Sequence, residues 1–200
     1  MDPRTSPRDI GDHGIYVASP SHGALTQCEI LSKVCWGTTV PEPTGSWVER
    51  RKESAFSIVL SQSCDLAWDH NAREREQWGS DKCMTSVLLV PLELATDIRG
   101  RGGDGRISSD QWALLKRNTV DRFHFLEAVP SHGDRRTEGL PELVADFKQY
   151  FSLPTADLYQ QMTHGAGRRA RLQSPYLEHF VARFFNYQAR VALPRPHASV

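Results

Sequence analysis

Two apolar stretches without internal breakers dominate the hydrophobic pattern of the chain. They cover residues 55–62 (AFSIVLSQ) and 85–92 (TSVLLVPL), and both contain β-branched side chains. Runs of this kind predict strands that are buried on both faces of a sheet. Because Pro91 has no N–H to give to a neighbouring strand, we expect the second strand to end there or to become an edge.

Weaker patterns predict further elements between and after these strands. Residues 27–36 predict a strand with a bulge, because their apolar positions do not alternate strictly. Residues 37–53 predict a loop, since two prolines and a glycine interrupt them. The charged segment 69–81 predicts a solvated excursion or a short helix. Residues 122–126 alternate and predict a strand, whereas 143–151 fit both helical and strand spacing.

Helical spacing is clearest near the C-terminus. Ser174 is the predicted N-cap and Pro175 the first helical residue. Apolar residues then recur every three or four positions, at Tyr176, Leu177, Phe180, Val181, Phe184 and Phe185. A shorter helix is predicted after Ser108, where Gln111 completes a capping box.

Composition limits the class of protein. Hydrophobic residues make up 39% and charged residues 24%, which suffices for one core and is too polar for a membrane protein. No apolar run approaches the roughly 20 residues that span a bilayer. The N-terminal segment lacks the apolar stretch of a signal peptide, so we expect a cytoplasmic protein whose four cysteines are thiols.

The pattern predicts an α+β protein with one domain over residues 14–193, flanked by flexible tails at 1–13 and 194–200. Lys+Arg and Asp+Glu balance at 24 each, so a nucleic-acid site has to be a local patch. The sequence has neither a C-x-x-C pair nor a phosphate-binding loop motif, and we expect no cofactor and no metal.

The segment that follows the best strand carries candidate chemistry. Ser61, Ser63, Cys64 and Asp65 lie where barrels display functional side chains. Cys64 is a nucleophile if a histidine activates it. The alternative is structural: a small buried cysteine with Asp65 capping a turn.

Two groups of side chains are candidates for binding. Arg99, Arg101 and Arg106 in a glycine-rich segment and Arg168, Arg169 and Arg171 before the last helix predict either a phosphate-binding patch or solvated basic loops. In the last helix, Phe180, Phe184 and Phe185 predict either core or a groove for a protein partner or a second copy.

Three stretches in this order, Gln27–Leu31, Phe56–Gln62 and Val87–Leu92, resemble the PemK/MazF family of toxin-like proteins. The resemblance covers roughly residues 25 to 190. It implies a small twisted SH3-like β-barrel with short helices and a C-terminal amphipathic helix, often dimeric, and it favours a strand within 143–151. Members of the family include ribonucleases that cut single-stranded RNA.

The chain departs from the family at the positions that catalyse cleavage. The family places an arginine and a proline directly before the second strand, where this chain has Ser54 and Ala55, with Arg50 and Arg51 upstream. It places a hydroxyl residue where this chain has Glu93. RNA cleavage of this type needs a cation for the developing charge and a group to handle the proton.

Two functions follow from the resemblance and its departures. The favoured one is a catalytically degenerate module that binds and restrains a protein partner in a toxin–antitoxin or antiviral defence system, in the manner of antitoxins or anti-sigma regulators. The alternative is a metal-independent endoribonuclease with a rearranged site. In that site Arg50 or Arg51 supplies the cation, and Ser61, Ser63 or Glu93 lies nearby.

Overall fold

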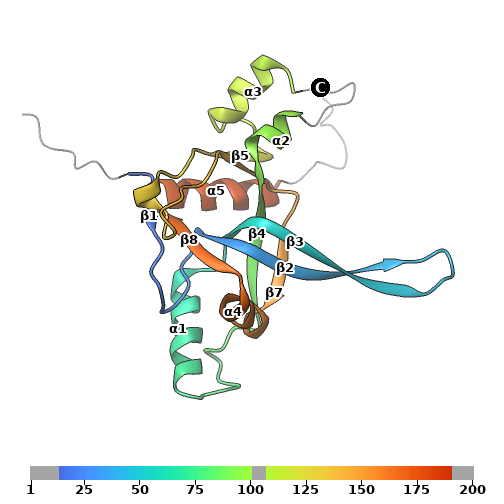
Figure 1. Ribbon diagram of the computed structural model, residues 1–200, viewed down its shortest axis with the longest axis vertical. Coiled ribbons are helices and arrows are strands. Elements are labelled where there is room, and N and C mark those ends of the chain that lie inside the picture. Colours follow the sequence, from blue (N-terminus) through green and yellow to red (C-terminus); the bar gives the residue numbers. More distant parts are fainter. Residues whose placement is uncertain (1–13, 101–106, 191–200) are drawn as a thin grey trace, which may run out of the picture.

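The computed structural model describes residues 14–100 and 107–190, and the predicted tails lie outside these ranges (Figure 1). The elements in chain order are β1 (Tyr16–Ala18), β2 (Glu29–Pro41), β3 (Trp47–Val59), α1 (Ser63–Glu74), β4 (Ser86–Leu94), α2 (Ala95–Gly100), α3 (Ser109–Lys116), β5 (Phe123–Leu126), the short helix η1 (Ser131–Gly133), β6 (Leu143–Asp146), β7 (Phe151–Pro154), α4 (Thr155–His164), β8 (Gly167–Leu172) and α5 (Tyr176–Gln188).

The strands form one antiparallel sheet in the order β1-β8-β2-β3-β4-β6-β5, and β7 pairs with β4 beside β6. The two strongest predicted strands are neighbours, because Val59 of β3 is the partner of Leu89 of β4. The mixed α+β class is confirmed. The closed barrel is wrong: within the described ranges β1 pairs only with β8 and β5 only with β6, so the sheet stays open.

Helix α5 packs against one face of the open sheet. The aromatic residues Phe180, Phe184 and Tyr187 of α5 share one core with side chains from β1, β2, β3, β4, β6 and β8. The opposite face of the sheet forms a second core with α1 and α4. Strand β3 supplies both cores, since Ile58 belongs to the first and Val59 to the second. The prediction of strands buried on both faces is therefore confirmed.

The predicted loop over residues 37–53 is wrong. Strand β2 runs to Pro41 and β3 starts at Trp47, so the segment is most of a long hairpin that projects from the body (Figure 1). The turn-forming residues are confined to its tip, where Glu42 N donates to Ser46 O and Gly45 has a φ of +84°. The flanking threonines and valines suit an extended ribbon. We call residues 36–52 the arm.

Pro91 does not end its strand. β4 continues to Leu94, because Pro91 lies between two ladders on the same side of β4. The pairing with β7 ends at Leu89, and the pairing with β6 begins at Leu92. The N–H that proline lacks is therefore not needed at this point.

The remaining expectations are mostly confirmed. The register of β2 against β8 shifts after Ile30, which is the predicted bulge. The capping box of Ser108 and Gln111 opens α3. Helix α5 forms, although Pro175 rather than Ser174 occupies its N-cap. Residues 143–151 divide between β6 and the start of β7. Strand β8 and helix α4 were not predicted, because the sequence shows no distinct hydrophobic pattern there. None of the described helices is long and apolar enough to cross a membrane.

Candidate nucleic-acid interface

The base of the arm is held by two contacts with the body. The ring of Trp36 stacks on Phe151 of β7, with centroids 4.1 Å apart and planes 13° apart. The carboxamide of Gln161 in α4 binds the outer edge of β2: its Oε1 accepts from Cys35 N and its Nε2 donates to Cys35 O, both at 2.8 Å. Because a lone two-stranded ribbon is marginally stable in water, these contacts are expected to stabilise the arm.

Two grooves flank this base, and Trp36 lines both. One has a volume of about 340 Å³ and includes Arg51, Glu49, Asp157 and Gln161. The other has a volume of about 460 Å³ and includes Lys52, Glu53, Phe56, Glu93 and Gln149. Each groove therefore places one cation near Trp36, and carboxylates line both grooves as well: Glu49 and Asp157 beside Arg51, and Glu53, Glu93 and Asp97 beside Lys52.

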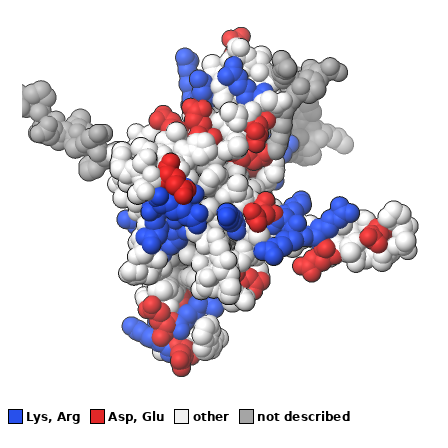
Figure 2. Space-filling model, viewed as in Figure 1, with Lys and Arg blue, Asp and Glu red and all other residues white. Residues whose placement is uncertain are grey.

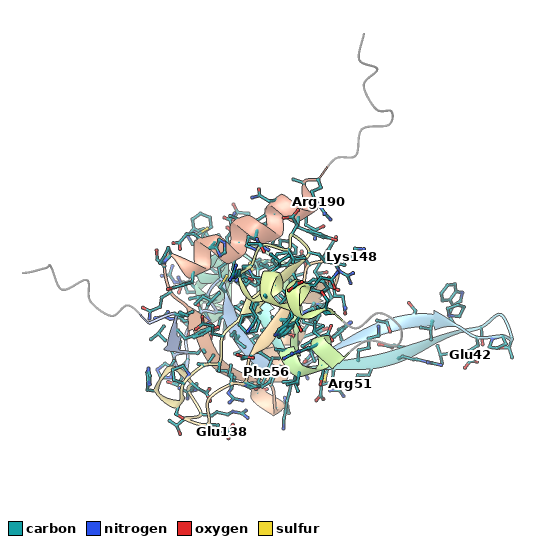
Figure 3. All side chains as sticks on the ribbon, turned by 90° about the horizontal axis from the view of Figure 1, so that it is seen from above. Glu42, Arg51, Phe56, Glu138, Lys148 and Arg190 are labelled. Atoms are coloured by element: carbon teal, nitrogen blue, oxygen red, sulfur yellow. The ribbon has the colours of Figure 1, made fainter. Side chains whose placement is uncertain are left out.

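Three consecutive cations, Arg50, Arg51 and Lys52, are exposed on β3. Successive side chains of a strand point to opposite faces, so these cations reach both sides of the ribbon. Figure 3 shows Glu42 toward the tip of the arm, Arg51 toward its base and Phe56 where β3 enters the body. A hydrogen bond with Cys35 raises the pKa of Arg51.

The cations continue from the arm onto the body. Lys33 is exposed on β2 just before the arm, and Arg135 and Arg136 are exposed after η1, where Arg135 N donates to the carbonyl of Arg169 in β8 at 2.8 Å. Figure 2 shows Lys and Arg gathered along the arm nearest the body and again where β8 lies in Figure 1. We call Lys33, Arg50, Arg51, Lys52, Arg135 and Arg136 the basic surface.

The predicted hydroxyl candidates lie far from the arginines of the arm. Ser61 Oγ accepts a hydrogen bond from Leu88 N at 2.9 Å, and Ser63 Oγ accepts one from Gln27 N at 3.0 Å. Eight residues of one strand separate Arg51 from Val59, which is about 26 Å at the usual rise of about 3.3 Å per residue. The structure therefore does not bring Ser61 or Ser63 to Arg50 or Arg51.

Cys64 and Asp65 lie together in the first turn of α1. Cys64 is exposed, and its Sγ lies 3.6 Å from both Gln62 Oε1 and Asp65 Oδ1. Among the described residues no histidine hydrogen-bonds to this thiol, so the base that a nucleophilic cysteine requires is not in place.

Glu93 does lie at the base of the arm. It lines the larger groove with Lys52, and its Oε1 accepts from Gln149 Nε2 at 3.3 Å. The structure thus brings Glu93 to the basic surface, together with Lys52 rather than with Arg51. Lys52, Trp36 and Gln161 were missed as site residues, and the run Arg-Arg-Lys beside acidic residues was the one signal in the sequence that pointed to this region.

Most of the arginines predicted to bind phosphate have structural partners. Arg168 forms a bidentate pair with Glu29, and Arg169 with Asp134; all four side chains are buried. Arg171 is half-buried in β8. Arg99 lies over the ring of Trp112 at 5.7 Å. Arg101 and Arg106 lie outside the described residues.

The three phenylalanines predicted to bind a partner do not share one surface. Phe180 and Phe184 are buried against Phe147, whereas Phe185 is 50% exposed. Phe185 alone of the three is available to a partner.

Comparison of the chain with family models, curated proteins and solved structures gave no match. The described residues contain no cluster of three or more metal-ligating side chains.

Proposed function

We propose that this protein is a binding module that holds single-stranded RNA on the arm and the basic surface. The observation that carries the proposal is the position of Trp36 between two grooves, one lined by Arg51 and the other by Lys52. Single-stranded nucleic acids are bound by cations that track the phosphates and by aromatic rings on which bases stack. The arm supplies both, because Lys52 is the cross-strand partner of Trp36 and Arg51 is the next residue along β3.

The proposal is for binding without cleavage. Ser61 and Ser63 already accept backbone hydrogen bonds at the far end of β3, and Glu93 places a carboxylate where the resemblance to PemK/MazF proteins implies a hydroxyl. Carboxylates beside a scissile phosphate oppose rather than stabilise the developing charge. A divergent PemK/MazF-like relationship is part of this proposal, and so is a cytoplasmic location; both are supported only by the sequence patterns described above.

The test is fluorescence anisotropy with a labelled oligouridine of about fifteen nucleotides, a length that covers the site sizes of known single-strand binders. The variant R50A/R51A/K52A is expected to bind roughly tenfold or more weakly, with a salt slope reduced by about 0.7 for each lost phosphate contact. The matched control R75A/K82A removes two exposed cations outside the basic surface and should bind like the wild type. Equal affinities for all three proteins would refute the proposal.

End mapping of the same RNA separates binding from catalysis. Intact ends after incubation support the binding module. New ends that disappear in R50A/R51A would instead establish the endoribonuclease alternative. The predicted role in restraining a protein partner remains a prediction, and Phe185 is the exposed residue through which it is testable.

A further inference from the structure

A small cavity lies between β1, β5 and the facing parts of α3 and α5, on a different part of the molecule from the arm. Its volume is about 190 Å³, which is smaller than the roughly 300–1,000 Å³ of sites for drug-sized ligands. Part of its wall is apolar and consists of Ile15, Leu126 and Leu172. The cavity therefore suits a small molecule with an apolar body.

One of the polar residues of the wall is a buried histidine. His124 of β5 is 4% exposed, and its Nδ1 has no hydrogen-bond partner among the described residues. Burial, together with the nearby charges of Arg183 and His179, lowers the pKa of His124 to about 3, so the imidazole is neutral at physiological pH. A buried polar group without a hydrogen-bond partner is destabilising. A ligand that hydrogen-bonds to this ring would remove that penalty.

The rim of the cavity is positively charged. Lys116 and Arg117, at the end of α3, line it and are exposed, and neither forms an ion pair within the described residues. His179 of α5 adds a second imidazole, whose ring centroid lies 5.4 Å from that of His124. Among the described residues, Glu127 is the one carboxylate on the wall. Cations outnumber it, which favours an anionic ligand.

We propose that this cavity binds a small organic anion, with its carboxylate near His124, Lys116 and Arg117 and its apolar body against Ile15, Leu126 and Leu172. In the bound state one ring nitrogen of His124 donates to the carboxylate. This inference does not depend on RNA binding, because no residue of the basic surface lines the cavity.

The test uses benzoate as the anionic probe and benzyl alcohol as its neutral counterpart in isothermal titration calorimetry. Benzoate is expected to bind saturably and roughly tenfold more tightly than benzyl alcohol, since hydrogen bonds to charged groups are the stronger ones. The variant K116A/R117A should lose most of this preference, whereas R75A/K82A should keep it. H124F, which removes the donor, should weaken benzoate binding more than benzyl alcohol binding, because a hydrogen bond to a carboxylate is stronger than one to a hydroxyl.

Three results would overturn the inference: no saturable benzoate binding, equal binding of the two probes, or unchanged benzoate binding in K116A/R117A. This double variant changes only exposed residues, so it remains decisive if H124F fails to fold. Failure here is distinguishable from failure of the proposed function, because oligouridine anisotropy is measured separately on the same proteins.

Discussion

The buried ion pair between Glu29 and Arg168 decides whether Arg168 is a structural residue or a contact for nucleic acid. The side chain of Glu29 is fully buried and that of Arg168 is 4% exposed. Arg168 also donates to the carbonyls of Gly23 and Ala24 at 2.9 and 3.0 Å. The substitution R168M removes these bonds and leaves the Glu29 carboxylate buried, where Thr26 alone among the described residues still donates to it.

Breaking a buried pair in this way costs about 3–5 kcal/mol, because one charge is left without compensation. Proteins of this kind unfold with a total free energy of about 5–15 kcal/mol, so R168M removes a large share of the stability. At about 2–4 °C per kcal/mol for a chain of this size, the melting temperature should fall by about 6–20 °C. The double variant E29Q/R168M leaves no buried charge and should lose less than R168M alone.

The assay is thermal unfolding followed by circular dichroism. The matched control is E138Q, which breaks the ion pair of Arg169 with the 66% exposed Glu138 and should cost about 0–1 kcal/mol. A melting temperature for R168M within about 2 °C of that of E138Q would refute the reasoning. If R168M also bound oligouridine less tightly while remaining that stable, Arg168 would be a nucleic-acid contact as the sequence predicted.

Three further predictions concern other parts of the fold. Burial alone would raise the pKa of Asp134, but hydrogen bonds from Arg169 and from backbone amides outweigh burial and lower this pKa. The ionised Asp134 therefore stabilises the fold at neutral pH, and this contribution is lost as the pH falls below about 4. Urea titrations should show a shallower loss of stability in acid for D134N than for the wild type. Q161A should speed hydrogen exchange of the Cys35 amide, and no change would contradict the proposed anchoring of the arm. F180A should cost about 3–5 kcal/mol in urea unfolding and F185A within about 0.5 kcal/mol; equal effects would refute the assigned burial.

The central strands could be predicted because their composition leaves few choices. A run such as Ser57–Leu60 has no exposed face to satisfy, so its burial on both faces follows from local sequence. The arm could not be predicted in the same way. Pro41 and Gly45 indicate a turn, but whether the residues beside a turn pair depends on the contacts that Phe151 and Gln161 make from far along the chain.

The candidate site was predicted only in part for the same reason. Arg50 and Arg51 were recognised as cations, and Glu93 as the residue that stands where the PemK/MazF family has a hydroxyl. The grouping of Arg51 and Glu93 around Trp36 depends on the pairing of β2 with β3 and of β3 with β4, which local patterns do not specify.

The sequence by itself determined the identity of the central strands, the capping of α3 and the aromatic face of α5, since each depends on neighbours within a few residues. The tertiary structure alone decided that the sheet stays open around α5, that Arg168 and Arg169 are buried with carboxylates, and that the cations of the arm flank an aromatic ring. These outcomes depend on contacts between residues that are remote in the chain. The energies of such contacts arise only when burial removes the contacting side chains from water.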